Sequence, residues 1–311
     1  MHQEISFHQK VEYFMYPFMY ELENELSKKE NELRKISYHA DEANTDRELK
    51  EYLKILISKN LKTLPNLNKE IHINYVDSKD EPMKYNYSFF NNLYIRNVVL
   101  PEEITEEIRN LVKRDNVVYT NPDILLEITN DNETHYVPVE LKSTKDNAIP
   151  GSSVQQINPS EWVVFIKHSK KNISITTGQY INSINSTMQF PDRSPRPSVS
   201  FKTLEDWNNL YRQTFEPNKG LGKKILSIDI SEDLLNNKLE IVNDWQGILV
   251  KRWMDVIINS QVKNNEPWFN YTIRRFTSEL LNYYDSLSNT ERKKLKTKII
   301  KDIKDDNKNK E

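Results

Sequence analysis

Two acidic residues and one lysine between Pro122 and Thr144 have the types and spacing that metal-assisted hydrolysis requires. Asp123 follows a proline and precedes an apolar stretch, and Glu140 and Lys142 come 17 and 19 residues later. Mg²⁺ prefers hard oxygen ligands and keeps several of its waters when one or two carboxylates hold it. A lysine beside the ion can orient or help deprotonate a water and can neutralise charge in a transition state. These three residues therefore suit the hydrolysis of a phosphodiester.

A β-hairpin would bring the three side chains together. The apolar run 124–128 and the alternating run that ends at Lys142 favour two strands, and the polar residues 130–133 between them favour a turn. Because side chains alternate along a strand, Glu140 and Lys142 must share one face of the second strand. Pro138 counts against the pairing, since proline cannot donate to a sheet and prefers edges or bulges.

An acidic residue two positions before a lysine is not a rare pattern in this sequence, which contains 29% charged residues. Most of the other instances lie in helix-like or polar segments, where they are typical of surface charge. Only Glu140 and Lys142 lie on a strand pattern behind an upstream Pro-Asp pair, although a solvated strand face is the competing interpretation. The other instances are Glu48–Lys50, Asp77–Lys79, Glu291–Lys293, Asp302–Lys304 and Asp306–Lys308.

Pro122-Asp123 and Glu140-Leu141-Lys142 resemble the motif of the PD-(D/E)xK nuclease superfamily, and more narrowly that of its type II restriction endonucleases. The resemblance covers roughly residues 95–180. It implies that Asp123, Glu140 and the backbone carbonyl of Leu141 bind the metal and that Lys142 assists the attacking water. It also implies Mg²⁺ as cofactor, double-stranded DNA as substrate, a homodimer that cuts both strands, and a cognate DNA methyltransferase as genetic partner.

Two other functions stay open at this stage. A nuclease of the same superfamily could act in repair or recombination, directed by DNA structure or damage and not by sequence. Alternatively, the chain could be a non-catalytic DNA-binding scaffold whose carboxylates hold no metal. A third upstream acid that completes the metal site is conceivable on either of two predicted helices, at Glu48, Glu51, Glu103, Glu106 or Glu107. Glu127 shares the face of Asp123 and could be an extra ligand or a charge at the rim of the site.

DNA contacts are expected from two loops that follow the motif. From Lys142 to Arg196 the chain has seven basic and three acidic residues, and DNA binding needs such local positive charge. The first loop offers polar side chains for phosphates and base edges, and a second, proline-rich segment offers arginines. A plain turn and a plain connection are the competing interpretations. The candidates are Lys145, Ser152, Ser153, Gln155, Gln156, Arg193 and Arg196.

Composition excludes several classes of protein. Cysteine is absent, which rules out disulfides and cysteine-ligated zinc and suits a cytoplasmic protein. No apolar run is long enough to cross a membrane, and we expect no membrane partner. With five glycines and no glycine-rich phosphate loop, an NTPase or a dinucleotide-binding enzyme is not expected. The net charge of −2 argues against a polycation that coats nucleic acid but not against a DNA enzyme.

The hydrophobic pattern predicts an α/β fold, with a mixed central β-sheet flanked by helices and helical additions at both ends. Residues 1–84 form a helical N-terminal region, with Pro17 at a helix start or break and one β-like run at 71–76. Residues 85–203 form the catalytic core, which includes a buried strand at 162–166. Residues 204–300 form a helical region for packing, dimerisation or DNA contact, and residues 301–311 form a disordered charged tail.

Overall fold

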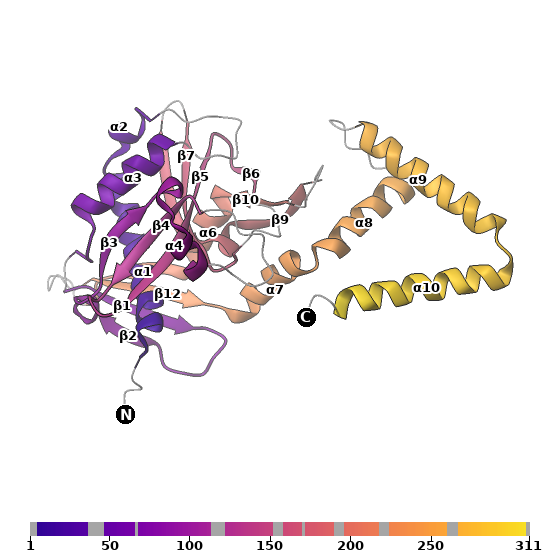
Figure 1. Cartoon of the computed structure of the whole chain (residues 1–311). Helices are drawn as coiled ribbons and strands as arrows, with labels where there is room; N and C mark the ends of the chain where they lie inside the picture. Colours follow the sequence, from indigo (N-terminus) through magenta and orange to yellow (C-terminus); the bar gives the residue numbers. More distant parts are fainter. Residues whose placement is uncertain are drawn as a thin grey trace. The chain divides into compact units, whose positions relative to one another are not determined.

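The hairpin that carries the acidic residues belongs to a five-stranded mixed sheet in the computed structural model of the chain (Figure 1). β3 pairs antiparallel with β4, β4 with β5 and β7 with β8, whereas β5 and β7 are parallel. The prediction of a mixed sheet flanked by helices is therefore confirmed. In their order across the sheet the strands are β3 (Tyr94–Val99), β4 (Ile124–Thr129), β5 (Thr134–Thr144), β7 (Trp162–His168) and β8 (Ile173–Gln179).

The chain divides into two compact units, residues 1–243 and residues 244–311. The five-stranded sheet lies in the first unit. The structure describes residues 5–36, 47–65, 68–112, 122–151, 158–169, 172–189, 196–217, 224–259 and 267–308.

Two helices bury their apolar stripes against one face of this sheet. α1 (Phe7–Ser27) and α3 (Arg47–Asn60) share a core with the buried side chains of β4 and β5 that alternate toward them. Pro17 was expected at a helix start or break, but it lies inside α1, where its ring is buried. The chain therefore accepts the loss of one backbone hydrogen bond in this helix, because the surrounding core holds α1 in place.

Two other helices pack on the opposite face. Leu125 of β4 is buried there against Ile104 and the side chains of α4 (Glu106–Val112). Farther along the sheet, the ring of Phe165 in β7 lies 5.8 Å from the ring of Phe201, which begins α6 (Phe201–Tyr211). The sheet is thus covered on both faces, as the continuous apolar run of β7 predicts.

The described residues of the first unit form two further sheets. One has the strand order β11 (Arg212–Phe215), β12 (Ile225–Ile230), β1 (Glu70–Tyr75) and β2 (Met83–Asn86). The other has the order β6 (Ala148–Pro150), β10 (Arg196–Ser200) and β9 (Ile184–Gln189).

The region 204–300 is not entirely helical, because β11 and β12 lie within it. β12 pairs in parallel with β1, so the N-terminal region and the start of the C-terminal region share one sheet. This pairing joins residues about 155 positions apart, as in the hydrogen bond from Asn74 to Asp229. Local periodicity carries no information on a partner at that distance. Because this remote pairing joins the predicted regions in one unit, the boundaries predicted at 84/85 and 203/204 do not coincide with the observed division at 243/244.

Short elements complete the first unit. They are α2 (Glu30–Leu33), the 3₁₀ turns Tyr87–Phe90 and Pro101–Glu103, the single turn α5 (Tyr180–Ser183) and α7 (Glu232–Asn243). None of the described helices of either unit is long and apolar enough to cross a membrane.

The second unit consists of α8 (Trp245–Ile258), α9 (Pro267–Ser286) and α10 (Asn289–Lys308). Asp244 lies between α7 and α8, and its carboxylate accepts a hydrogen bond from Gly247 N and caps α8. The disordered tail predicted for 301–311 is wrong over residues 301–308, which continue α10. Residues 309–311 lie outside the described part. Lysine has a good helix propensity, and this outweighs the low apolar content of the tail.

We expect the buried face of β4 to dominate the stability of the first unit. Leu126 is fully buried in the shared core, whereas Leu111 on α4 is 68% exposed. Leu126→Ala should lower the free energy of unfolding by about 2 to 5 kcal/mol, because it leaves a cavity. Leu111→Ala should change it by about 0.5 kcal/mol or less. Urea denaturation of both variants checks this, and equal losses would contradict the packing described here.

Candidate active site

The β4–β5 hairpin sets the register of the site. Asn130 Oδ1 accepts hydrogen bonds from Asn132 N and Glu133 N, and Asp131 adopts a positive φ of 74°, so this polar run forms the predicted turn. Ile124 then pairs with Val139. As a result, Asp123 enters β4 beside Glu140, on the same face of the hairpin.

Pro138 fits this hairpin because of where the parallel strand begins. On one side it lies opposite Leu125 of β4. On the other side, the pairing of β5 with β7 begins only at Val139, which pairs with Trp162. At Pro138 the strand therefore has a paired neighbour on one side only, which is the edge-like position that proline tolerates.

Both oxygens of Asp123 are engaged. Asp123 Oδ2 accepts a hydrogen bond from Leu141 N at 2.8 Å, and Asp123 Oδ1 lies 2.8 Å from Lys50 Nζ. The N–H and C=O groups of one strand residue point to the same side. The carbonyl of Leu141 therefore lies on the side of Asp123, which is consistent with its expected role as a metal ligand.

Glu140 and Lys142 form an ion pair through Glu140 Oε1 and Lys142 Nζ. Lys142 is 8% exposed. Burial alone would lower the pKa of Lys142, but the carboxylate of Glu140, with smaller contributions from Tyr180 and Asp123, raises this pKa above its ordinary value. Lys142 is therefore protonated at neutral pH, and in the free protein it is a source of positive charge and not a base.

Lys50 completes a group of four charges that sequence analysis did not assemble. We call Asp123, Glu140, Lys142 and Lys50 the charge cluster; it contains two carboxylates and two ammonium groups, all largely buried. Lys50 belongs to the acid-x-lysine pattern Glu48–Lys50, which on a helix is typical of ordinary surface charge. The apolar stripe of α3 could have given a signal, because Lys50 follows the buried Leu49 at the side of that stripe.

Tyr180 is a second residue of the site that the sequence did not indicate. It is 2% exposed on the single turn α5, and it interacts electrostatically with Lys142, since it contributes to raising the pKa of that lysine. The hydroxyl of Tyr180 also explains a glycine in the loop after Lys142. A Cβ at Gly151 would lie 2.6 Å from Tyr180 Oη and 2.6 Å from Pro197 O, so only glycine fits there.

The donors of the cluster suit Mg²⁺ better than a metal that needs a large protein cage. Asp123, Glu140 and the Leu141 carbonyl supply hard oxygen atoms, and Mg²⁺ needs few of these because it retains waters. Within the described residues, three or more acidic or histidine side chains nowhere gather in a way that could hold a metal. The two carboxylates would therefore have to share the ion with waters and with a phosphate of the substrate.

The structure brings no third acid into the cluster from the residues proposed for that role. Glu51, Glu103 and Glu106 each pair with a basic residue outside the cluster, namely Arg47, Lys54 and Arg109, and Glu48 and Glu107 are exposed. Glu127 lies on the predicted face and pairs with Arg96. Four residues of strand separate Glu127 from Asp123, about 13 Å, so Glu127 is a charge at the rim.

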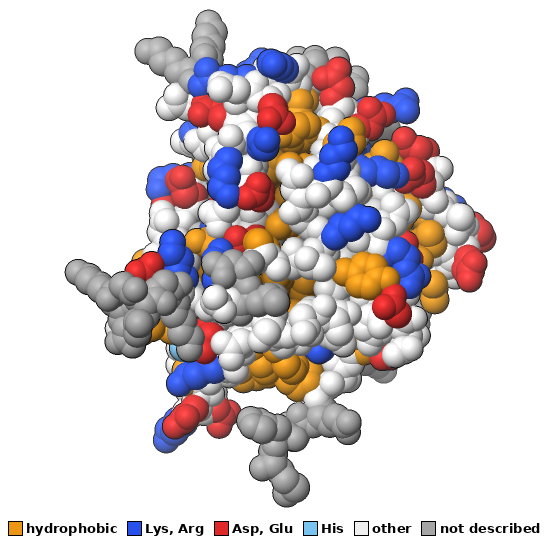
Figure 2. Space-filling model, turned by 90° about the vertical axis from the view of Figure 1, so that its left-hand side faces the viewer, with side chains coloured by type: hydrophobic (Ala, Val, Ile, Leu, Met, Phe, Trp, Pro, Cys, Tyr) orange, Lys and Arg blue, Asp and Glu red, His pale blue; other side chains and the backbone are white. Residues whose placement is uncertain are grey.

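The candidates for DNA contact lie mostly outside the described residues, as Ser152, Ser153, Gln155, Gln156 and Arg193 do. Lys145 is exposed in the loop after β5, three residues beyond Lys142. The backbone of Arg196 begins β10 and pairs with Gln189. On the face drawn in Figure 2, lysine and arginine side chains are interspersed with acidic ones, and no large patch of one sign is visible.

No protein-family model, curated protein or solved structure matches this chain. The interpretation of the charge cluster therefore depends on its geometry and on the motif alone.

The ion pair between Glu140 and Lys142 should be strongly coupled, because both side chains are largely withdrawn from water. In a double-mutant cycle with Glu140→Gln and Lys142→Met, we expect a coupling free energy of about 1 to 3 kcal/mol from urea unfolding. The more exposed pair of Lys54 and Glu103 is the control, and its cycle should give less than about 1 kcal/mol. A coupling between Glu140 and Lys142 no larger than that of the control pair would contradict a strong ion pair withdrawn from water.

Proposed function

We propose that the chain is a Mg²⁺-dependent, site-specific DNA endonuclease of the type II restriction kind. The main support for this proposal is that Asp123, at the start of β4, lies beside Glu140 and Lys142 on the neighbouring strand β5. The motif resemblance adds a specific reaction, hydrolysis of a phosphodiester bond in double-stranded DNA. A protonated lysine buried beside two carboxylates is costly to maintain for structure alone, which favours a functional role.

Each residue of the cluster would have its own task. Asp123, Glu140 and the Leu141 carbonyl would hold the ion, which when bound acts as a Lewis acid and lowers the pKa of a water. Lys142, protonated before substrate binds, would orient the attacking water and neutralise negative charge as the water oxygen bonds to phosphorus and the bond from phosphorus to O3′ breaks. The product would carry a 5′-phosphate. Lys50 would act as a positioning residue that orients Asp123.

The polypeptide would work as a homodimer, since cutting both strands at a symmetric site needs two active sites related by a two-fold axis. The second unit offers apolar side chains for such a contact. Phe276, Leu280 and Tyr283 follow one another at helical spacing on α9 and are 64%, 43% and 55% exposed. A cognate DNA methyltransferase would protect the host sequence, and a methyltransferase gene next to this one would support the restriction role.

Cleavage of DNA in the presence of Mg²⁺ tests the proposal directly. We expect the full-length protein to cut phage or plasmid DNA into discrete bands. Asp123→Asn, Glu140→Gln and Lys142→Gln should each lower the rate about a hundredfold or more, because each removes a ligand or a charge that stabilises the transition state. Lys50→Gln should lower it by about ten- to a hundredfold, as partners of metal ligands do.

Two matched substitutions serve as controls for the cleavage assay. Glu127→Gln changes a carboxylate on the same face of β4, and Lys54→Gln changes a lysine one turn after Lys50 on α3. Both variants should cut DNA at close to the unchanged rate. Full activity in the Asp123→Asn, Glu140→Gln and Lys142→Gln variants would reject the proposal. Cutting that ignores sequence but follows junctions or flaps would support the repair nuclease in its place.

Calorimetry separates an enzyme from a scaffold. The protein should bind Mg²⁺ or Ca²⁺ with heat that disappears in Asp123→Asn and Glu140→Gln, because two carboxylates provide the charge for the ion. The Glu127→Gln variant should bind as the unchanged protein does. A protein that binds DNA but neither metal would be the non-catalytic scaffold.

A further inference from the structure

A cavity between α1 and the central sheet has a lining that the proposed cleavage reaction does not use. Its volume is about 310 Å³, at the lower end of the range of about 300 to 1,000 Å³ that small-molecule sites occupy. No member of the charge cluster belongs to its described lining. We call it the tyrosine cavity, and the residues of its lining that matter here are Glu12, Tyr13, Tyr16, Tyr75, Glu161 and Trp162.

The aromatic rings of this cavity are held in place by their neighbours. Tyr16 and Trp162 meet at 85° with 5.0 Å between their ring centres, and Tyr13 stacks on Tyr85 at 5.6 Å. The three tyrosines of the lining, which include Tyr75, are each only partly buried, so a ligand can reach them. Rings that are already ordered lose little freedom when a ligand binds, and the walls are therefore preorganised.

Negative charge lies among these rings. Glu12 and Glu161 are both in the lining, whereas its described residues contain no lysine or arginine. Burial raises the pKa of Tyr13, Tyr16 and Tyr75, and the carboxylate of Glu12 contributes to the rise in all three. The charge of Glu12 therefore acts on three hydroxyl groups of the cavity at once.

The entrance to the cavity carries the same carboxylate. The side chains of His8 and Glu12 are 60% and 57% exposed, and Glu12 Oε1 lies 3.4 Å from His8 Nε2. A contact between groups as exposed as these contributes little, so Glu12 stays available to a cation. Deeper in the lining, His135 adds no positive charge at neutral pH, because burial, together with His8, lowers the pKa of its ring.

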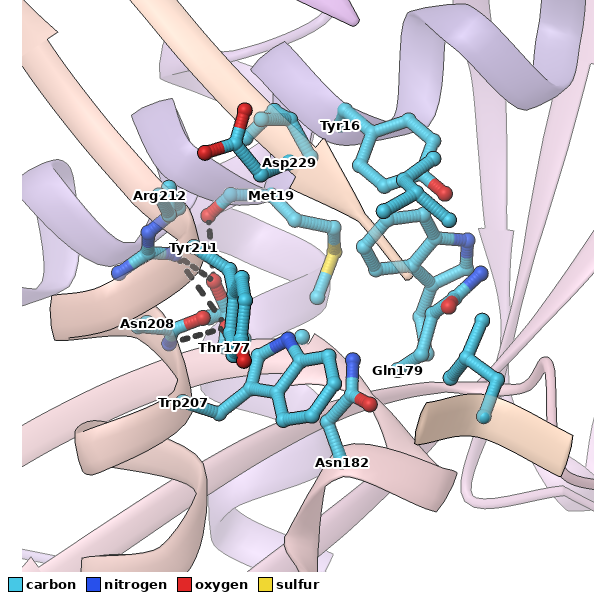
Figure 3. A pocket seen from close by; sticks show the side chains of 15 residues that line it. Tyr16, Met19, Thr177, Gln179, Asn182, Trp207, Asn208, Tyr211, Arg212 and Asp229 are labelled. Carbon is cyan, nitrogen blue, oxygen red and sulfur yellow. Dashed lines mark hydrogen bonds between the residues drawn. The ribbon is translucent and has the colours of Figure 1, made fainter. Parts of the chain in front are cut away.

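A smaller cavity that shares Tyr16 and Trp162 supplies no cation either. Its volume is about 40 Å³, which is too small for an organic ligand (Figure 3). Arg212 is in its lining, but hydrogen bonds hold the guanidinium group at Thr177, as the dashed lines of Figure 3 show, and Glu23 pairs with it. The charge of Arg212 is therefore balanced within the fold and does not serve the tyrosine cavity.

Aromatic rings beside a carboxylate select a cationic ligand. The faces of tyrosine and tryptophan rings attract a cation, and the attraction grows as water is removed. A metal ion is not favoured, because among the described residues no three acidic or histidine side chains gather to hold one. A primary ammonium is strongly hydrated and needs acceptors to replace its waters. A quaternary ammonium has no N–H group and presents methyl groups, which suit rings better.

We propose that the tyrosine cavity binds a small quaternary ammonium ion, with its charged head among Tyr13, Tyr16 and Tyr75 and within the field of Glu12. The organic part of such a ligand would lie against Val137 and Pro138, which also line the cavity. This binding function is separate from the proposed cleavage of DNA and does not depend on it.

Calorimetric titration of the full-length protein with choline tests the proposal. The comparison ligand is 3,3-dimethylbutan-1-ol, in which a carbon replaces the charged nitrogen while the shape is kept. Choline should bind, and the neutral alcohol should bind at least about tenfold more weakly, which corresponds to 1.4 kcal/mol. Ethanolamine, which carries a primary ammonium on the same two-carbon chain, should also bind more weakly than choline.

Substitutions in the lining locate the bound choline. Glu12→Gln should weaken choline about fivefold or more, because it removes the nearby charge. Its melting temperature should not change, since this side chain is more than half exposed. Tyr13→Leu should weaken choline about fivefold or more, whereas Tyr13→Phe keeps the ring and should bind as the unchanged protein does. Glu25→Gln, which removes a carboxylate from α1 outside the described lining, is the control and should bind choline normally.

Several results would overturn the proposal. They are a lack of choline binding, an equal affinity for the neutral alcohol, tighter binding of ethanolamine than of choline, and unchanged choline binding in the Glu12→Gln variant. None of these measurements requires DNA or Mg²⁺. A protein that binds choline but does not cut DNA would therefore reject the nuclease alone, and one that cuts DNA but does not bind choline would reject the cavity proposal alone.

Discussion

Charge balance in a poorly hydrated space is the constraint on which the rest of this structure depends. Two carboxylates and two ammonium groups meet where β4 begins, and none of them could be buried there without the others. The fold meets this requirement with three independent pieces. The hairpin places Glu140 and Lys142 beside Asp123, and the hydrogen bond from Leu141 N fixes the Asp123 carboxylate. Helix α3 supplies Lys50, which pairs with the other oxygen of that carboxylate.

The parts that the sequence could predict are those governed by local rules. Alternation along β5 and the turn residues after β4 were sufficient for the hairpin and for the face shared by Asp123, Glu140 and Lys142. Lys50 could not be found in the same way, because its approach to Asp123 depends on how α3 packs, and the same short pattern occurs elsewhere as surface charge. Tyr180 was equally hidden, since nothing in its own segment indicates that α5 turns it toward the cluster. The strands β11 and β12 were missed because their partner is remote in the chain.

The position of α5 bears on the charge cluster, because this turn carries Tyr180. A turn of four residues is too short to move as a flexible arm, and both of its ends are held. Tyr180 N donates to Glu161 O at its start, and Lys238 donates to carbonyl oxygens near its end. This turn therefore holds Tyr180 where it interacts electrostatically with Lys142.

The parallel pairing of β1 with β12 also bears on how the chain is made. During synthesis, β1 leaves the ribosome long before residue 225, so it can pair only with β2 at that time. Its other edge stays open while the whole charge cluster is translated and can assemble. An open strand edge is a site for wrong pairing with other chains, and closing it late is slow because the contact is remote in sequence. The nascent chain would thus have its charge cluster in place before the sheet of β1 and β12 is closed, and its greatest exposure to aggregation would fall in that interval.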